Sequence, residues 1–346
     1  MTAKAKAPKR ISINLALQGG GAQGAFTWGV LDRLSEEEAI EVEGISGTSA
    51  GALNAAAFTY GFIKGGHKGA KKELHNLWHT ISEVSGALNP TQMWSPFFPN
   101  DFLGWSPVNF WMDFASQILS PYQLNPLNYC PLREVLHKTI DFEVLQNTKR
   151  KIKLFIGATN VETNRLKMFH DDEICEETLL ASACLPTLFQ AVKWKGHYYW
   201  DGGYMGNPVL ESLIYHCVSK DIILVPINAM HHHGVPTTPK AILDRLNEIT
   251  FNASLMREIR GLLRIQSLPE HLSKKNPYLN VRLHCIQNEK FMGKLDARSK
   301  YNTDWAFLLK LKKIGRASAD CWIKENYQKL GKETSMDLSN WEMEEP

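Results

Sequence analysis

Residues 11–34 read ISINLALQGGGAQGAFTWGVLDRL and contain the pattern that decides the fold. The first seven residues are mostly apolar, which predicts a buried strand over 11–17. Four glycines within 19–24 predict a turn. The apolar spacing over 25–34 then favours a helix. The stretch therefore predicts a strand, a glycine-rich turn and a helix in succession.

The same order recurs along the chain. We expect a second strand over 39–45, a turn over 47–51 and an alanine-rich helix over 50–63. Two later apolar runs, 151–158 and 221–227, also predict strands. Alternating strands and helices predict an α/β fold with a mostly parallel sheet. Ligands of such sheets gather at the carboxyl ends of the strands, where both glycine turns lie.

Composition excludes several other classes of protein. Lys and Arg number 39 and Asp and Glu 36, so the net charge is only +3, which gives no electrostatic basis for a nucleic-acid partner. The six cysteines are scattered without paired spacing, which argues against a disulfide scaffold or a cysteine zinc site and fits a reducing compartment. No apolar run reaches the roughly 18 residues of a membrane span, so we expect no transmembrane helix.

The sharpest local feature is the sequence GTSAG, in which Ser49 stands between Gly47 and Gly51. It follows a predicted strand and opens a predicted helix, as in the G-x-S-x-G elbow of serine hydrolases. The positive end of the helix dipole would favour negative charge developing at the Ser49 hydroxyl. A plain turn that caps a helix has the same pattern, so the motif alone leaves both interpretations open.

The loop GGGAQG runs from Gly19 to Gly24 and has two functional interpretations. Adjacent backbone N–H groups could form an oxyanion hole. Gly19, Gly21 and Gly24 also match the dinucleotide pattern G-x-G-x-x-G, with Glu43 where a ribose-binding acid is expected. A turn needed only for packing is a third possibility. A Walker A loop is excluded because no Gly-Lys-Ser/Thr follows.

A third feature is Asp201, followed by Gly202 and Gly203 after an aromatic run that predicts a strand. A serine nucleophile needs a base, and none of the histidines, including the run 231–233, lies in a recognisable motif. Asp201 is therefore the natural candidate base for Ser49, in a two-residue dyad.

Taken together, these motifs resemble the patatin-like phospholipases over about residues 11–230. Two further segments are similar to that family: ASACLP at 181–186 and Asn207-Pro208 after the Asp-Gly-Gly motif. Two positions depart from the family pattern, because Gln18 and Gln23 stand where many members carry an acidic and a basic residue. We expect activity to survive this difference, whereas the substrate charge preference does not follow from the family.

The resemblance implies a three-layer α/β/α fold and a Ser–Asp dyad that needs no metal or cofactor. Ser49 is then the nucleophile and Asp201 the general base, and the oxyanion hole is formed by the N–H groups of three residues: Gly20, Gly21 and Ala22. The implied function is hydrolysis of carboxylic esters of lipids through an acyl-enzyme. A hydroxyalkanoate polyester hydrolase on the same dyad, a catalytically silent scaffold and a nucleotide-binding protein remain the alternatives.

We divide the chain into a disordered basic tail (1–10), a hydrolase core (11–230), a helical C-terminal extension (231–331) and a loose tail (332–346). An insertion, 86–131, interrupts the core. We expect a lipid or other acyl-ester substrate, transient contact with a membrane surface, no nucleic acid, and contact between copies through the C-terminal helices. The location is left open between the cytoplasm, a membrane periphery, and secretion without a signal peptide.

The insertion is unusual in composition. Its stretch 90–131 holds seven of the 16 prolines, and 94–129 holds ten of the 35 aromatic residues. Because proline breaks regular structure, we expect an irregular segment with one short helix near 108–119. Its rings could form a lid or acyl-binding wall suited to a membrane interface, or simply cover the core.

Overall fold

A computed structural model of the chain describes residues 10–87, 119–147, 151–228, 230, 234–269, 276–295 and 297–338. Within these ranges, eight strands form one sheet in the order β5-β6-β3-β2-β1-β7-β8, with β4 paired to β3 off this path. The strands are β1 (Ile11–Leu17), β2 (Ile40–Thr48), β3 (Lys153–Asn160), β4 (Arg165–His170), β5 (Val192–Trp194), β6 (His197–Asp201), β7 (Asp221–Val225) and β8 (Arg282–Cys285).

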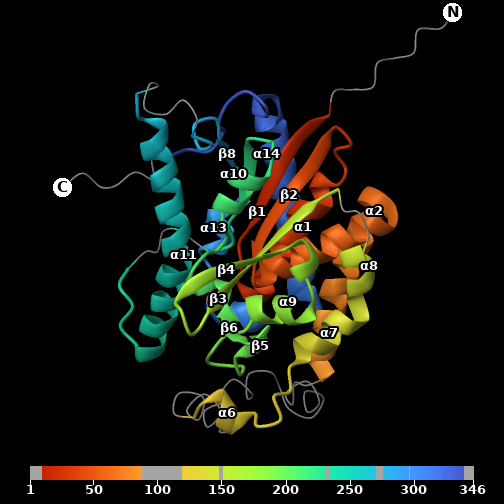
Figure 1. Cartoon of the computed structure of the whole chain (residues 1–346), viewed down its shortest axis with the longest axis vertical. Helices are drawn as coiled ribbons and strands as arrows, with labels where there is room; N and C mark the ends of the chain where they lie inside the picture. The colour runs from red at the N-terminus through yellow and green to blue at the C-terminus, as the bar shows by residue number, and fades with distance from the viewer. Residues whose placement is uncertain are drawn as a thin grey trace, which may run out of the picture.

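The sheet is mixed but mostly parallel, as the sequence predicts. The strands β3, β2, β1, β7 and β8 are parallel, so their carboxyl ends share one edge. The hairpin of β5 and β6 and the strand β4 join antiparallel. In Figure 1, β1 and β2 cross the centre of the molecule, with the cyan helix α11 on one side and the orange helix α2 on the other.

Helices cover both faces of this sheet. They are α1 (Ala25–Leu34), α2 (Ala50–Ala87), α6 (Pro121–Leu124), α7 (Pro131–Thr139), α8 (Phe142–Asn147), α9 (Glu176–Ser182), α10 (Glu211–His216), α11 (Pro239–Gln266), α13 (Glu289–Met292) and α14 (Trp305–Asn326). Short 3₁₀-helices are η1 (Gly21–Gly24), η3 (Asp171–Glu173), η4 (Gly202–Tyr204), η5 (Ala297–Tyr301) and η6 (Tyr327–Lys329). No helix within the described ranges is long and apolar enough to cross a membrane.

The alternation of side chains along the strands builds two hydrophobic cores. In β1, Ile13 and Leu15 point into a core formed with α1, α2 and α14, while Ala16 points into a second core. That second core holds Ile222 of β7 and Leu255 of α11. Because successive residues of a strand face opposite sides, one apolar strand serves both cores. This gives the three layers expected for an α/β/α fold.

The helix predicted over 50–63 extends further than its pattern suggested. The chain leaves helical geometry at Gly65 and Gly66, where the prediction stops, and then resumes as the second part of α2. Its continuation is stabilised by burial of apolar side chains such as Leu74 and Trp78, which contact the first core. The two glycines thus interrupt the helix, and tertiary packing explains why a second helical part forms after them.

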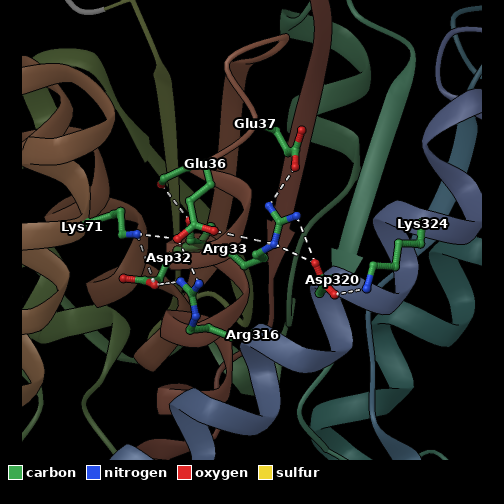
Figure 2. Close-up of polar contacts among 10 residues, drawn as sticks. Asp32, Arg33, Glu36, Glu37, Lys71, Arg316, Asp320 and Lys324 are labelled. Carbon is green, nitrogen blue, oxygen red and sulfur yellow. Dashed lines mark hydrogen bonds and ion pairs between the residues drawn. The ribbon is translucent and has the colours of Figure 1, made fainter.

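Helix α14 lies against α1, and an ion-pair network joins the two helices (Figure 2). Asp32 of α1 is buried and pairs with Arg316, which also binds Glu36 at 2.9 Å. Arg33 binds Asp320 of α14 at 3.1 Å. Partly exposed pairs contribute only about 0–1 kcal/mol each, so the network mainly fixes the orientation of α14. The C-terminal region is thereby held against the helix that follows the glycine-rich loop.

The end of the described chain differs from what the sequence predicts. Residues 332–338, predicted as part of a loose tail, lie against β8: the amides of Ser335 and Met336 both donate to the carbonyl of Leu283 at 3.1 Å. Met336 is buried in the second core. The polar composition of this segment concealed one apolar anchor and its backbone pairing.

Most of the proposed insertion lies outside the described residues. This holds for its predicted helix near 108–119, apart from residue 119, and for eight of its ten aromatic residues, Trp94 to Phe114. The other two, Tyr122 and Tyr129, are exposed. Residues 1–9 and 231–233 are likewise outside the described ranges.

Candidate active site

Ser49 lies on a sharp turn between the end of β2 and the start of α2. Its φ of 54° places it in the left-handed region, which non-glycine residues adopt at a cost of about 1–3 kcal/mol. The chain crosses itself so closely that a Cβ atom at Gly51 would collide with the carbonyl oxygen of Leu17. The side chain of Ser49 is half-buried at the carboxyl edge of the sheet. This is the strained elbow that the GTSAG motif predicts.

Ser182, the last residue of α9, fixes this turn from the side. Its hydroxyl accepts a hydrogen bond from the backbone amide of Ser49 at 2.9 Å and donates one to the carbonyl of Gly157 at 2.7 Å. Ser182 is fully buried, where a hydroxyl group is normally hydrogen-bonded, as this one is. In the sequence, only the similarity of ASACLP to the family marked Ser182. Its contact with Ser49 could not be predicted, because the two residues lie more than a hundred positions apart.

Replacing Ser182 by alanine is expected to weaken both the elbow and the activity. Two buried backbone groups lose their partner, so the free energy of unfolding should fall by about 1–3 kcal/mol. A shift of the Ser49 hydroxyl should lower kcat by about 10- to 100-fold. Urea unfolding and ester turnover measure the two effects. Ser212→Ala is the matched control, since Ser212 is buried and its hydroxyl makes no hydrogen bond within the described part of the chain; equal losses in both variants would contradict the role of Ser182.

The register of the sheet places Asp201 close to Ser49. Thr48 at the end of β2 pairs with Gly157 of β3, and the next residue, Ala158, pairs with Asp201 at the end of β6. The Asp201 side chain is fully buried, and its Oδ1 accepts a hydrogen bond from the amide of Gly203 at 2.7 Å. The second oxygen, Oδ2, is buried and has no partner with hydrogen-bond geometry in the described structure.

Burial determines the protonation behaviour of Asp201. Loss of solvent raises the pKa of this carboxyl from 3.8 to about 7, although the amide of Gly203 and the hydroxyl of Ser49 both act to lower it. The opposing effect of Ser49 reflects how close its hydroxyl lies to the carboxyl. A carboxyl with a pKa near neutral pH can both accept and return a proton.

The glycine-rich loop lies beside Ser49. A Cβ atom at Gly19 would stand 2.6 Å from the Cβ of Ser49, and the amide of Gly19 donates to Asn207 Oδ1 at 2.6 Å. The loop then turns into η1, where Gly21 has a φ of 59°. The first amides of a helix have no acceptor within it. No side chain among the described residues accepts from the amides of Gly20, Gly21 or Ala22, the three groups predicted to form an oxyanion hole.

A buried amide network supports this loop from behind. Gln18 donates from Nε2 to Asn252 Oδ1 of α11 at 2.9 Å and accepts from the amides of Ile227 and Asn228 at 2.8 and 2.9 Å. Asn228 in turn donates to the carbonyl of Gly19 at 3.1 Å. A carboxylate could not replace Gln18 without losing the donor to Asn252. The departure from the family pattern at this position is therefore matched by a partner from the C-terminal region.

Gln23 also has a hydrogen-bond partner in the C-terminal region. Its Nε2 donates to the hydroxyl of Ser299 in η5 at 2.8 Å, and a Cβ at Gly21 would collide with the carbonyl oxygen of Lys300 in the same short helix. On the other side, the ring of Phe251 packs against Gly203. Sequence analysis missed all of these C-terminal contributions, because no local motif marks a single asparagine, serine or phenylalanine as a partner of a distant loop.

Glu43 and the histidines, which the sequence offers as further candidates, do not contribute to this site. Glu43 lies within β2 at the irregularity between the pairs Ile13–Val42 and Asn14–Gly44, before the strand ends. It accepts hydrogen bonds from the amides of Val218 and Ser219 at 2.8 Å. It is therefore not placed to bind a ribose at the glycine-rich loop, and this weakens the nucleotide-binding alternative. No histidine within the described ranges forms a hydrogen bond or ion pair with Ser49 or Asp201.

A family model described as patatin-like phospholipase matches residues 15–214, which include the elbow, the glycine-rich loop and Asp201. Among solved structures, the chain is similar to VipD from Legionella pneumophila, with 15% identity and a TM-score of 0.41, over 92% of this chain and 67% of that one. No curated protein sequence matches.

Proposed function

This chain belongs to the patatin-like phospholipase family, which supports the general function of a lipid acyl hydrolase. We propose that it cleaves carboxylic esters with Ser49 and Asp201 as a catalytic dyad. The observation that carries this proposal is the state of Asp201. Its carboxyl is fully buried, that burial raises its pKa to about 7, and the Ser49 hydroxyl acts to lower that pKa. A carboxylate in water is too weak a base for serine, whereas this one is tuned to neutral pH.

The proposed reaction uses the two steps of acyl-enzyme chemistry. Ser49 Oγ attacks the ester carbonyl while Asp201 takes its proton on Oδ2, the oxygen that has no other partner. The amides of Gly20, Gly21 and Ala22 stabilise the oxyanion. The alcohol leaves with the proton held by Asp201, which then takes a proton from the water that attacks the acyl-enzyme. As the bond between Ser49 Oγ and the acyl group breaks, Asp201 gives that proton to Ser49 Oγ, so the fatty acid is released and both residues are restored.

Membrane contact belongs to the proposal as well. Near the site, the first half of α11 exposes apolar side chains, with Ile242, Leu246 and Ile249 between 42% and 54% accessible. Their spacing places them on one face of the helix. An exposed apolar stripe beside a lipid-hydrolysing centre supports transient binding to a lipid surface.

The pH dependence tests the proposed dyad. Because only the ionised form of Asp201 accepts a proton, we expect kcat/KM for a soluble ester to rise with pH and to level off above about 7. The rate at which a fluorophosphonate labels Ser49 should follow the same curve, with the adduct mapped by mass spectrometry. A label on another residue, or a rate that does not change between pH 5 and 8, would count against the dyad.

A further inference from the structure

A second serine, apart from Ser49, begins a chain of hydrogen bonds at the edge of the sheet. Ser335 Oγ lies 2.8 Å from His284 Nδ1, and His284 Nε2 lies 3.0 Å from Asp221 Oδ1. His284 belongs to β8, the last strand in the sheet order, and Asp221 begins the neighbouring strand β7. A hydroxyl, an imidazole and a carboxylate in this succession are the groups that activate a serine as a nucleophile.

The position of the protons in this chain follows from Asp221. Its carboxyl accepts hydrogen bonds from Arg282 Nε and Nη2 at 2.9 and 2.7 Å and from the amide of Gly331 at 2.9 Å. Burial acts to raise the pKa of Asp221, but the hydrogen bonds from His284 and Arg282 outweigh it and hold this pKa well below its usual range. Because an ionised carboxylate only accepts, neutral His284 carries its proton on Nε2. Its Nδ1 lone pair is therefore available to the hydroxyl of Ser335.

The base of this chain is enclosed, whereas the serine faces open space. His284 is fully buried, and the ring of Trp322 lies nearly perpendicular to it with the two centroids 5.7 Å apart. Ser335 is half-buried and lines a cavity of about 570 Å³ between the end of β8, helix α14 and the segment 335–337. A hydroxyl that only anchors the chain needs no such opening, whereas a nucleophile does.

The wall of this cavity also offers hydrogen-bond donors. Gln287 and Asn288 follow β8 and line the cavity, and their backbone amides donate to no group within the described ranges. Amides that are not engaged in secondary structure can stabilise the oxyanion of a tetrahedral intermediate. The cavity thus holds a serine with its base and the donors that acyl transfer requires.

The charged side chains that line the cavity are all acidic. They are Glu289, Glu325 and Asp337, and no lysine, arginine or histidine joins them among the described residues. Apolar side chains such as Trp322 and Met336 form another part of the wall. Carboxylates attract a cation, and an indole ring or a thioether suits the methyl groups of a quaternary ammonium. This lining favours a reactant that carries an ammonium group.

We propose that Ser335, His284 and Asp221 form a second hydrolytic centre, which cleaves small carboxylic esters of amino alcohols. Ser335 Oγ attacks the ester carbonyl carbon and its proton passes to His284 Nδ1, while Asp221 stays ionised and stabilises the imidazolium. The bond between the carbonyl carbon and the alcohol oxygen breaks, and the alcohol leaves with the proton from Nδ1. Water then gives a proton to Nδ1 as it attacks the acyl group. Ser335 Oγ recovers that proton when the carboxylic acid is released.

Hydrolysis of butyrylcholine by the Ser49→Ala protein tests this centre, because the proposed dyad is then absent. Titration of the released butyric acid avoids thiol reagents, which would modify Cys285 and Cys321 in the cavity wall. We expect Ser335→Ala in the same background to lower kcat/KM by about 10³-fold or more, the loss typical of removing a nucleophile. Acid quenching during turnover and peptide mass spectrometry should find a butyryl group on Ser335 in the Ser49→Ala protein.

Thr334→Val is the matched control, because the Thr334 hydroxyl binds the amide of Leu283 at 3.3 Å rather than the imidazole. This variant should keep the rate of its Ser49→Ala parent. In Ser335→Ala the backbone amide of residue 335 keeps the carbonyl of Leu283 as its acceptor, so an unchanged midpoint of thermal unfolding is expected. The uncharged isostere 3,3-dimethylbutyl butyrate should be hydrolysed about 10-fold more slowly than butyrylcholine.

Three results would each overturn the second centre: release of butyric acid by the Ser49→Ala protein no faster than in buffer, equal rates with and without the Ser335 hydroxyl, or no butyryl group on Ser335. Equal rates for the two esters would overturn the choice of an ammonium-bearing substrate. Lipid hydrolysis by the unmodified protein is measured separately, so a failure of this centre leaves the proposed role of Ser49 and Asp201 unchanged.

Discussion

Replacing Ser49 by alanine is expected to lower kcat/KM for lipid esters by about 10⁴-fold or more, the loss typical of removing a covalent nucleophile. The reason is local: no other described hydroxyl combines the left-handed elbow, the neighbouring amides of the glycine-rich loop and an influence on the pKa of a buried carboxyl. The substitution removes one oxygen atom from a half-buried side chain, so the protein should remain folded. Release of fatty acid from micelles, measured over several hours, gives the residual rate.

Ser46→Ala provides the matched control for this experiment. Ser46 lies in β2, just before the turn that carries Ser49, is fully buried, and its hydroxyl has no hydrogen-bond partner in the described structure. We expect this variant to keep the full rate. A Ser49→Ala protein that hydrolyses lipid as fast as the Ser46→Ala protein would rule out an acyl-enzyme at Ser49.

Replacing Asp201 by asparagine should change activity and stability in opposite directions. Without its base, the reaction is expected to slow by about 10⁴-fold, as when the carboxylate of a catalytic triad is neutralised. The amide of Gly203 keeps its acceptor in the variant. At the same time, the variant no longer holds a charge in a fully buried position, so it should resist denaturant better than the unmodified protein at neutral and alkaline pH.

The sign of the stability change follows from proton linkage. The pKa of Asp201 is about 7 in the folded state and 3.8 in the unfolded state, so between these values the folded state binds the extra proton. The free energy of unfolding therefore falls as pH rises from about 4 to about 7. Asparagine removes this dependence, and the gain at pH 8 should be roughly 1–4 kcal/mol.

Urea unfolding at pH 5 and pH 8 measures the difference. Asp172→Asn, at an exposed aspartate of η3, should show no comparable gain. An Asp201→Asn variant that is less stable at pH 8 would indicate that the carboxylate serves the fold rather than the reaction.

Local patterns predicted the elements of the fold well. Residues 11–17 and 25–34 form β1 and α1 with the expected bounds, because strand and helix each bury a continuous apolar face. Helix α14 likewise begins at a local signal in the sequence, because the Asp304 carboxylate accepts a hydrogen bond from the amide of Phe307 at 3.0 Å. Prediction failed where long-range packing decides, as in the continuation of α2 beyond Gly65 and Gly66.

The candidate site was predictable only as separate motifs. Each motif sits in a strand-to-helix turn, and so Ser49 and the glycine-rich loop could be assigned to one edge of the sheet. The supporting groups Ser182, Asn252 and Ser299 could not be found in this way, because their hydrogen bonds depend on the final packing of α9, α11 and η5. The predicted contact between copies through the C-terminal helices stays a prediction.

The contacts of η5 and α11 with the glycine-rich loop also affect when the protein can become active during its synthesis. Residues 19–24 are translated before Asn252 and Ser299, which bind Gln18 and Gln23. A nascent chain cannot complete the anion-binding loop until those segments emerge. The glycine-rich loop would therefore stay incomplete until η5 has been translated, and a hydrolase directed at lipids would stay inert until then.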